Sequence, residues 1–472
     1  MKKPIEFAVV FFMDFVTIFF IFKLSVFIRK SLSLVFHSVF PEALPSATLT
    51  HLWWIFVVWM FFFYYEGLYS RMFSYWDEIR ILWKVIFLST VGVFTITAVG
   101  KMSDEISRTV IVLMGLIAIA LLPLIRMTFK KTLRRTGLLQ RRVLILGAGE
   151  TGRLMLKALN REPNYGYKII GFLDDDPEKC GKMIEGLKIH RGVDKALHYI
   201  NRCNIEDIFI TMPGAGKDRL QGLINNLQHK VENILFVPDV FGIAVLGTSL
   251  QHFFQEEAFA LELKNNLSRP VNIILKKCFD IGLCMLLLPL LLFPMIVLIV
   301  LIKLDSKGPS IFAQRRPGKD GKIFHCYKFR TMFVDAEKRM QHLFKEHPEM
   351  AAEWDQYRKL KNDPRITKVG HLLRATSLDE LPQIFNVLKG EMSLVGPRPY
   401  LLGDELNFGE NTVNLLTKPG ITGLWQVSGR SNTSHLYRVA LDSWYVRNWN
   451  LWLDIVILLK TVRIVIKREG AY

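Results

Sequence analysis

Long apolar segments are the feature that most constrains how this chain of 472 residues can fold. Half of the residues are hydrophobic although 22% are charged, so the apolar residues must be concentrated in particular segments. Four of these segments fall within residues 1–130, and they predict a four-helix transmembrane domain there. The expected spans cover residues 5–28, 49–65, 82–99 and 110–129.

Two charged residues, Asp14 and Lys23, lie inside the first span. The acid is expected to face the interior of the helix bundle and the lysine to extend its amine to the membrane interface. Basic residues crowd the exit of the fourth span, so the positive-inside rule predicts that everything after residue 130, and Met1 with it, is cytoplasmic. They are Arg126, Lys130, Lys131, Arg134, Arg135, Arg141 and Arg142.

Strands and helices alternate from residue 142 onward, which predicts a Rossmann-like α/β domain over residues 140–250. Gly147, Gly149 and Gly152 follow its first strand with the spacing G-x-G-x-x-G, whose bare backbone amides can hold a phosphate. Two interpretations stay open, nucleotide binding or glycines that serve only to pack a helix on a strand. The strands are expected over residues 143–152, 168–173, 207–212 and 234–238.

A fifth apolar segment, residues 279–305, follows a polar linker, residues 251–270. Its uninterrupted core of 22 residues is about 33 Å long as a helix, barely enough to cross a membrane. Basic residues flank both ends, and Pro289 and Pro294 supply a bend in the middle. We therefore expect a re-entrant helix that enters and leaves the cytoplasmic leaflet. The alternative is a kinked transmembrane helix, which would place the C-terminal domain outside the cell.

Two adjacent acids, Asp379 and Glu380, stand in the run RATSLDELPQ, residues 374–383. One interpretation is structural, because Ser377 and Glu380 fit a capping box and Pro382 fits a first helical turn. A helix is then expected to begin just after Ser377, with both acids at its positive end. The other interpretation is an active site in which the two acids have different roles, since neighbours on a helix do not share a face.

Basic side chains recur beside proline and glycine turns in the C-terminal part of the chain. A planar guanidinium held by such a turn suits the clamping of a diphosphate. Alternatives stay open for some of these positions. Lys328 and Arg330 could bind lipid headgroups rather than substrate. Arg398 could serve only as a turn residue, and Asp442 could cap a helix. The candidate substrate-binding residues are Arg374, Lys328, Arg330, Arg398, Arg430 and Asp442.

The formal net charge of +18 indicates anionic partners. Phosphate-bearing substrates and lipid headgroups are expected, and no nucleic acid, because the sequence has no zinc-finger or RRM signature. The five cysteines form no C-x-x-C pair and are expected to be reduced.

Six motifs follow one another in residues 271–472: YKFRTM, DPRIT, SLDELPQ, NVLKGEMSLVGPRP, PGITGLWQVSGR and the terminal GAY. In this order they resemble the bacterial polyprenyl-phosphate phosphoglycosyltransferases of the monotopic kind. The N-terminal half is similar to the long form of that family, most of all to the undecaprenyl-phosphate galactose phosphotransferases. The fold that the resemblance implies is a multidomain membrane protein: a transmembrane bundle, a Rossmann-like α/β domain, and a re-entrant helix with a mainly α (α/β) catalytic domain.

The resemblance implies transfer of a hexose-1-phosphate from a UDP-sugar to undecaprenyl phosphate, with UMP as the second product. The hexose is expected to be galactose, with glucose as the alternative. Asp379 would be the nucleophile that carries a covalent phosphosugar, Glu380 would bind Mg²⁺, and Arg374 would contact phosphate. The enzyme would act as a homodimer on the cytoplasmic face of the bacterial inner membrane, at the first membrane step of O-antigen, capsule or exopolysaccharide synthesis.

Two other classes of protein compete with this interpretation. A membrane-anchored nucleotide-sugar dehydratase or epimerase would share the four helices and the glycine loop. It would need a Tyr-x-x-x-Lys pair, which residues 140–250 do not contain, and it would leave residues 271–472 unexplained. A non-catalytic polysaccharide-assembly protein would have no need of Arg374, Asp379 and Glu380 together.

Overall fold

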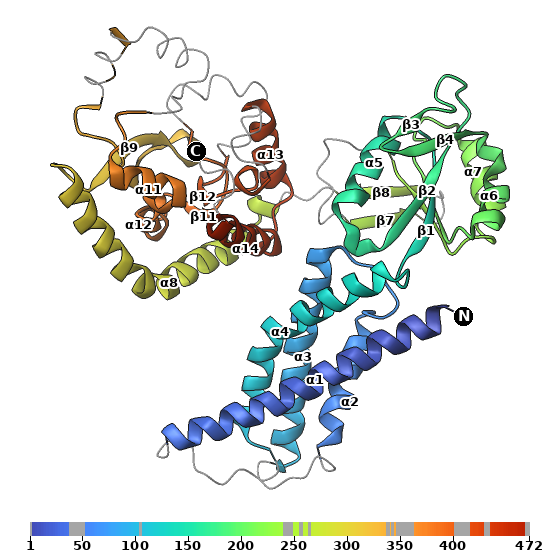
Figure 1. The fold of residues 1–472 in the computed structure, drawn as a ribbon, viewed down its shortest axis with the longest axis horizontal. Helices are drawn as coiled ribbons and strands as arrows, with labels where there is room; N and C mark the ends of the chain where they lie inside the picture. The colour runs from blue at the N-terminus through green and yellow to red at the C-terminus, as the bar shows by residue number, and fades with distance from the viewer. Residues whose placement is uncertain are drawn as a thin grey trace. The chain divides into compact units, whose positions relative to one another are not determined.

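The structure is a computed structural model that divides the chain into two compact units, Met1–Val240 and Phe241–Tyr472 (Figure 1). The first unit holds the N-terminal helices together with the α/β domain, and the second holds the remainder. The described residues are 2–36, 52–102, 106–238, 249–253, 258–262, 266–336, 340, 344–345, 363–400, 416–428 and 435–467.

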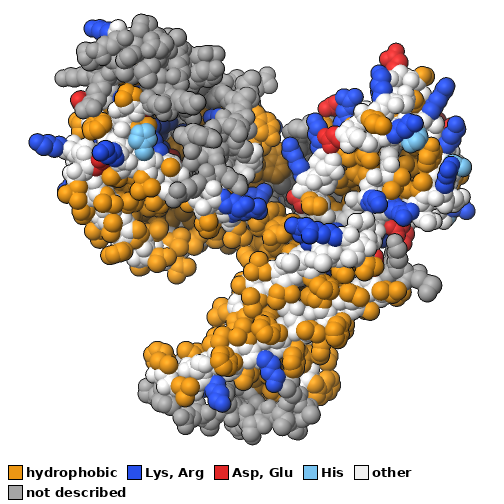
Figure 2. Space-filling view, in the orientation of Figure 1, with side chains coloured by type: hydrophobic (Ala, Val, Ile, Leu, Met, Phe, Trp, Pro, Cys, Tyr) orange, Lys and Arg blue, Asp and Glu red, His pale blue; other side chains and the backbone are white. Residues whose placement is uncertain are grey.

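Four helices occupy the N-terminal region, as predicted. Three of them, α1, α3 and α4, are long and apolar enough to cross a membrane, whereas α2 has 13 residues. The first residues of the span predicted over 49–65 lie outside the described part of the chain. Hydrophobic side chains cover the outer surface of this bundle (Figure 2). The helices are α1 (Lys2–Val35), α2 (Trp53–Tyr65), α3 (Tyr75–Val99) and α4 (Arg108–Arg135).

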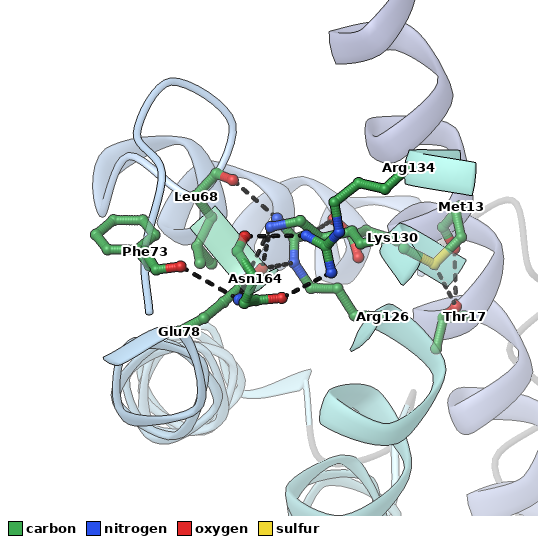
Figure 3. Close-up of polar contacts among 10 residues, drawn as sticks. Met13, Thr17, Leu68, Phe73, Glu78, Arg126, Lys130, Arg134 and Asn164 are labelled. Carbon is green, nitrogen blue, oxygen red and sulfur yellow. Dashed lines mark hydrogen bonds and ion pairs between the residues drawn. The ribbon is translucent and has the colours of Figure 1, made fainter. Parts of the chain in front are cut away.

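Buried charges pair with one another inside this bundle (Figure 3). Arg126 of α4 donates to Oε1 of Glu78 on α3 at 2.9 Å and to the Leu68 carbonyl at 2.8 Å, and it forms an ion pair with Asp14 of α1. Lys130 lies 2.8 Å from both oxygens of Glu78. Asp14 therefore faces the interior, as predicted, and its charge is balanced on another helix.

Glu78 also bonds a residue of the α/β domain. Asn164, in the 3₁₀ turn Pro163–Tyr165, donates its side-chain N–H to Oε2 of Glu78 at 2.8 Å. Arg134 of α4 in turn donates to the carbonyl and to Oδ1 of Asn164, at 2.9 and 3.0 Å. We call these residues the junction cluster: Asp14, Glu78, Arg126, Lys130, Arg134 and Asn164.

The α/β domain is a six-stranded sheet in the order β3-β4-β2-β1-β5-β6, parallel except for β3. Alternate residues of β1 face opposite sides: Val143 and Ile145 pack in the core under α5, whereas Leu144 and Leu146 pack in the core under α6 and α7. Helices thus cover both faces of the sheet. The strands are β1 (Arg141–Leu146), β2 (Tyr167–Asp174), β3 (Met183–Ile184), β4 (Leu187–Arg191), β5 (Asp207–Ile210) and β6 (Asn233–Phe236), and the helices are α5 (Glu150–Arg161), α6 (Ala196–Cys203) and α7 (Lys217–Leu227).

The second unit begins with an antiparallel hairpin, β7 (Ser249–Phe253) and β8 (Ala258–Glu262), within the stretch expected to be a linker. A second hairpin and a parallel strand pair follow helix α8. These elements are α8 (Pro270–Asp305), β9 (Ile311–Pro317), β10 (Ile323–Phe329), α11 (Lys368–Thr376), α12 (Gln383–Lys389), β11 (Ser393–Val395), β12 (Gly420–Thr422), α13 (His435–Arg447) and α14 (Leu451–Lys467).

Helix α8 contains both Pro289 and Pro294, and Figure 1 shows it bent in its middle. Its first half is held on the unit by polar contacts: Asp280 accepts from the Ser393 hydroxyl at 2.7 Å, and Lys276 pairs with Asp454 at 2.7 Å.

The second half of α8 packs on the same unit. Leu298 and Ile302 lie in a core with Phe329 and Leu373, and Asp305 accepts from the backbone N–H at the start of α11. The opposite side of α8 exposes a row of apolar side chains (Figure 2). They include Met285, Leu286, Leu290, Phe293, Ile296 and Val300.

Candidate active site

A cavity of ≈ 1580 Å³ lies within the second unit. The ends of α8, β10 and α11 border it, together with the turns around Arg398 and Trp425. Six of the eight residues predicted to be catalytic or substrate-binding line this cavity. They are Lys328, Arg330, Arg374, Asp379, Glu380 and Arg398.

A helical turn does begin just after Ser377, as predicted, but it is a 3₁₀ turn and not the start of an α-helix. Ser377 instead closes helix α11: it adopts a left-handed backbone with φ 57°, and its N–H bonds the carbonyls of Leu373 and Arg374. A 3₁₀ turn, Leu378–Glu380, then carries the two acids to α12, which begins only at Gln383. Ser377 makes no side-chain capping bond to this turn, so the capping-box interpretation fails.

The turn places the two acids beside cations rather than at the first turn of a long helix. Lys328 Nζ lies 2.7 Å from Oε1 of Glu380. Arg374, in the last turn of α11, donates from Nε to the Thr331 hydroxyl at 3.0 Å. Both cations therefore come from elements that the chain folds together, β10 and α11.

Burial, and after it the neighbouring Glu380 carboxylate, raises the pKa of Asp379 to about 6. The charges of Lys328 and Arg374 oppose that rise. A group with a pKa of about 6 is still mostly ionised at pH 7, so Asp379 can act as a nucleophile there.

Arg330 has a bonding pattern that differs from that of the other cations. Its Nη2 donates to the carbonyl and the hydroxyl of Ser306, at 2.7 and 2.9 Å. Ser306 follows the last residue of α8, so Arg330 ties the end of β10 to the end of that helix. This contact fixes one wall of the cavity.

Asp442 is buried and does not appear in the lining of the cavity. It accepts from the Tyr400 hydroxyl at 2.7 Å and from the Arg398 backbone N–H at 3.3 Å, and burial raises its pKa to about 7. Asp442 therefore supports the main chain at Arg398, a role that differs from the substrate contact that was expected. The other remaining prediction, Arg430, lies outside the described residues.

Several residues that line the cavity were not predicted from the sequence. Trp425 stacks against Arg398, with the guanidinium carbon 5.1 Å from the ring centroid, and Gln426 and Thr331 lie along the same cavity. Trp425 and Gln426 stand in a motif quoted for the family resemblance, but no periodicity reveals which way a side chain in a turn points. Only the fold supplies that information.

One side of the cavity is apolar. Its lining there comes from α8, β12 and α14, and it includes Leu287, Leu291, Ile421, Ile464 and Val465. A ligand with a charged group and a hydrocarbon chain could therefore contact basic and apolar walls together.

The residues around Glu380 suit a divalent cation that a phosphorylated substrate brings with it. Lys328 engages Oε1, and among the described residues no side chain bonds Oε2. The described part of the chain holds no group of three metal-ligating side chains. Mg²⁺ commonly binds through one or two carboxylates plus substrate phosphates, so Glu380 fits that ion.

The glycine loop of the α/β domain is explained largely by packing. A Cβ at Gly147 would lie 2.8 Å from the carbonyl oxygen of Thr211, and one at Gly152 would overlap the carbonyl of Gly147. Gly149 alone faces open space. The Asp174 carboxylate, at the end of β2, accepts from the Ala148 N–H of this loop at 2.7 Å.

Two protein families match the sequence. Residues 271–468 match the family described as bacterial sugar transferase, and residues 63–238 match the family described as CoA-binding domain. The first match covers the whole cavity lining.

Three relatives are similar along most of the chain. The UDP-galactose-lipid carrier transferase of Erwinia amylovora is 36% identical over 399 residues, 84% of this chain and 83% of the relative. The undecaprenyl-phosphate galactose phosphotransferase of Salmonella typhimurium is 36% identical over 401 residues, with the same coverage. The UDP-glucose:undecaprenyl-phosphate glucose-1-phosphate transferase of Xanthomonas campestris is 30% identical, over 81% of this chain and 79% of the relative.

Proposed function

The chain belongs to the bacterial sugar transferase family, and from that we propose that it transfers a hexose-1-phosphate from a UDP-sugar to undecaprenyl phosphate. The observation that carries the proposal is the pairing of Asp379 and Glu380 with Lys328 and Arg374 in a cavity that also has an apolar wall. The reaction is the first membrane step of O-antigen, capsule or exopolysaccharide synthesis.

In the first half of the reaction, an oxygen of the Asp379 carboxylate attacks the phosphorus that bears the sugar. A bond forms between that oxygen and phosphorus, and the bond from phosphorus to the bridging oxygen breaks. UMP leaves with the electron pair. Arg374 and Lys328 lie beside the acids and would offset the negative charge of the diphosphate, which otherwise repels a carboxylate.

In the second half, a phosphate oxygen of undecaprenyl phosphate attacks the same phosphorus. The aspartyl oxygen is the leaving group, so Asp379 returns to its carboxylate and the sugar diphospholipid is released. Donor and acceptor both present phosphate, which allows one basic cavity to serve both halves.

Glu380, with the substrate phosphates, would hold Mg²⁺. When bound, Mg²⁺ would neutralise charge on the diphosphate and orient it. Lys328 contacts the same carboxylate and so fixes its direction.

Galactose is the proposed hexose because two relatives with galactose in their names share 36% identity with this chain. Glucose is the alternative, since a relative named for glucose-1-phosphate transfer is 30% identical. With purified protein, undecaprenyl phosphate and Mg²⁺, UDP-galactose is expected to give UMP and a lipid-linked hexose diphosphate. UDP-glucose is the matched comparison, and faster turnover of it would reassign the hexose. No UMP from any UDP-hexose would overturn the proposal.

A re-entrant path for α8 is also part of the proposal. Both halves of this helix contact the same unit, and its opposite side is apolar, which supports a bent helix lying in one leaflet. The acceptor phosphate lies at the surface of that leaflet. The homodimer expected from the family resemblance stays a prediction.

The topology can be tested with a tag that contains a cysteine, placed after Tyr472 and labelled with a thiol-reactive reagent. A membrane-impermeant reagent is expected to label it only after the inner membrane of the cells is opened, because the second unit lies on the cytoplasmic face. A tag at the N-terminus should behave in the same way. Labelling after Tyr472 in spheroplasts with an intact membrane would contradict the re-entrant path and favour a transmembrane α8.

A further inference from the structure

Two guanidinium groups stack on one indole ring in the wall of the cavity. The guanidinium carbons of Arg398 and Arg438 lie 5.1 and 5.3 Å from the centroid of Trp425, which is 5% exposed. Such stacking is a cation–π attraction, strongest for tryptophan. Trp425 lies in a 3₁₀ turn, Trp425–Val427. Arg398 comes from the segment after β11 and Arg438 from α13, so two separate segments deliver the two cations to this ring.

The main chain under Arg398 is held on both sides. Asp442 accepts from its N–H, and the next carbonyl, that of Pro399, accepts from Nη1 of Arg316 at 3.0 Å. The guanidinium itself makes no hydrogen bond or ion pair within the described part of the chain. Its donors are therefore available to a ligand, on a backbone that is already fixed.

The indole N–H adds a donor. Trp425 Nε1 is buried and has no hydrogen-bond partner in the residues that the structure describes. An unpaired buried donor costs stability, and an acceptor on a ligand would remove that cost. Both stacked groups are cations, so a ligand that suits them is an anion. The unpaired indole donor and the two cations point to the same ligand chemistry, a phosphate.

The neighbourhood favours the phosphate of the lipid over that of the nucleotide. The Trp425–Val427 turn packs on α14, whose Ile464 and Val465 line the cavity and whose Val462 and Ile466 are exposed. A polyprenyl phosphate needs an apolar path next to its charged end, whereas a UDP-sugar does not. The other cations, Lys328 and Arg374, lie beside the acids and are placed for the donor diphosphate.

Resting on the proposed function, we propose that Arg398 and Arg438, held on Trp425, bind the phosphate of the polyprenyl acceptor. Trp425 is a positioning residue in this subsite, and Arg438 is a second cation that the phosphate contacts. Arg398 and Trp425 line the same cavity as the catalytic acids, and Arg438 stacks on Trp425.

The test uses the full-length protein in lipid nanodiscs and measures KM separately for undecaprenyl phosphate and for the UDP-sugar. Trp425→Leu and Arg438→Gln are each expected to raise KM for the acceptor about tenfold or more, because a charge-assisted contact or its support is lost. Their KM for the UDP-sugar should stay within about twofold of the unaltered protein. Trp425→Phe keeps an aromatic face, so it should raise KM for the acceptor less than Trp425→Leu does.

Trp444→Leu is the matched control, since Trp444 lies on α13 with 37% of its surface exposed. It should leave both constants unchanged. An unchanged KM for the UDP-sugar also reports that each variant is folded. If the variants raise KM for the UDP-sugar and leave KM for the acceptor unchanged, the subsite binds the donor and the proposal is overturned. Equal changes in both, or none, also overturn it. Absence of turnover in the unaltered protein would instead count against the proposed function.

Discussion

Replacing Asp379 by Asn is expected to lower the turnover of sugar-phosphate transfer by about a thousandfold or more, because an amide cannot form the covalent bond to phosphorus. The side chain keeps its size, and its place in the Leu378–Glu380 turn depends on the backbone, so folding should be preserved. Mass spectrometry of the intact protein, incubated with UDP-galactose and no lipid, provides the direct measurement. The unaltered protein should gain one hexose phosphate, and the variant should gain nothing.

Asp320→Asn is the control for this experiment. Asp320 is exposed in the turn between β9 and β10, where its φ of 56° is a conformation that asparagine tolerates. That variant should form the adduct at the normal rate. Full transfer activity in Asp379→Asn would remove the covalent mechanism, and an adduct mapped to another residue would reassign the nucleophile.

The second large effect concerns stability. Replacing Arg126 by Met is expected to lower the free energy of unfolding by about 3–5 kcal/mol, because Asp14 and Glu78 would keep buried charge after losing a partner. Thermal unfolding of the purified protein in detergent, together with the yield of membrane-inserted protein, measures the loss. Removing the charge of Asp14 as well, in Arg126→Met with Asp14→Asn, should recover part of it.

Lys84→Met is the matched control for Arg126. Lys84 also pairs with an acid, Glu66 at 2.6 Å, but its side chain is 58% exposed, so this pair should contribute less than about 1 kcal/mol. If Arg126→Met unfolded at the same temperature as Lys84→Met, the junction cluster would not stabilise the bundle.

The sequence predicted best those elements whose signal is local. Length and hydropathy located the N-terminal helices, and the run of apolar residues from Val143 to Leu146 located a strand buried on both faces. The turn at Ser377 was mispredicted for the opposite reason. No sequence pattern marks a serine whose backbone adopts the left-handed conformation. The packing of α11 against its surroundings decides that the helix ends there.

Pairings across long sequence separations were also out of reach. Asp14 was expected to face the interior, but nothing in the sequence joins it to Arg126, which was counted among the loop cations. Asp442 was expected to contact substrate, yet its neighbours in space, Tyr400 and the Arg398 backbone, give it a supporting role. Six of the predicted site residues nevertheless line one cavity, and they were selected because they stand in motifs whose order is characteristic of the family.

Helix α8 belongs to the second unit, whereas the four N-terminal helices belong to the first. Both halves of α8 are secured within its own unit, at Asp280 and at Asp305. With α8 in the membrane as proposed, each unit has its own attachment. A protease cut near residue 240 would leave two fragments that each sediment with the membrane, and the catalytic fragment would keep its own access to lipid substrate.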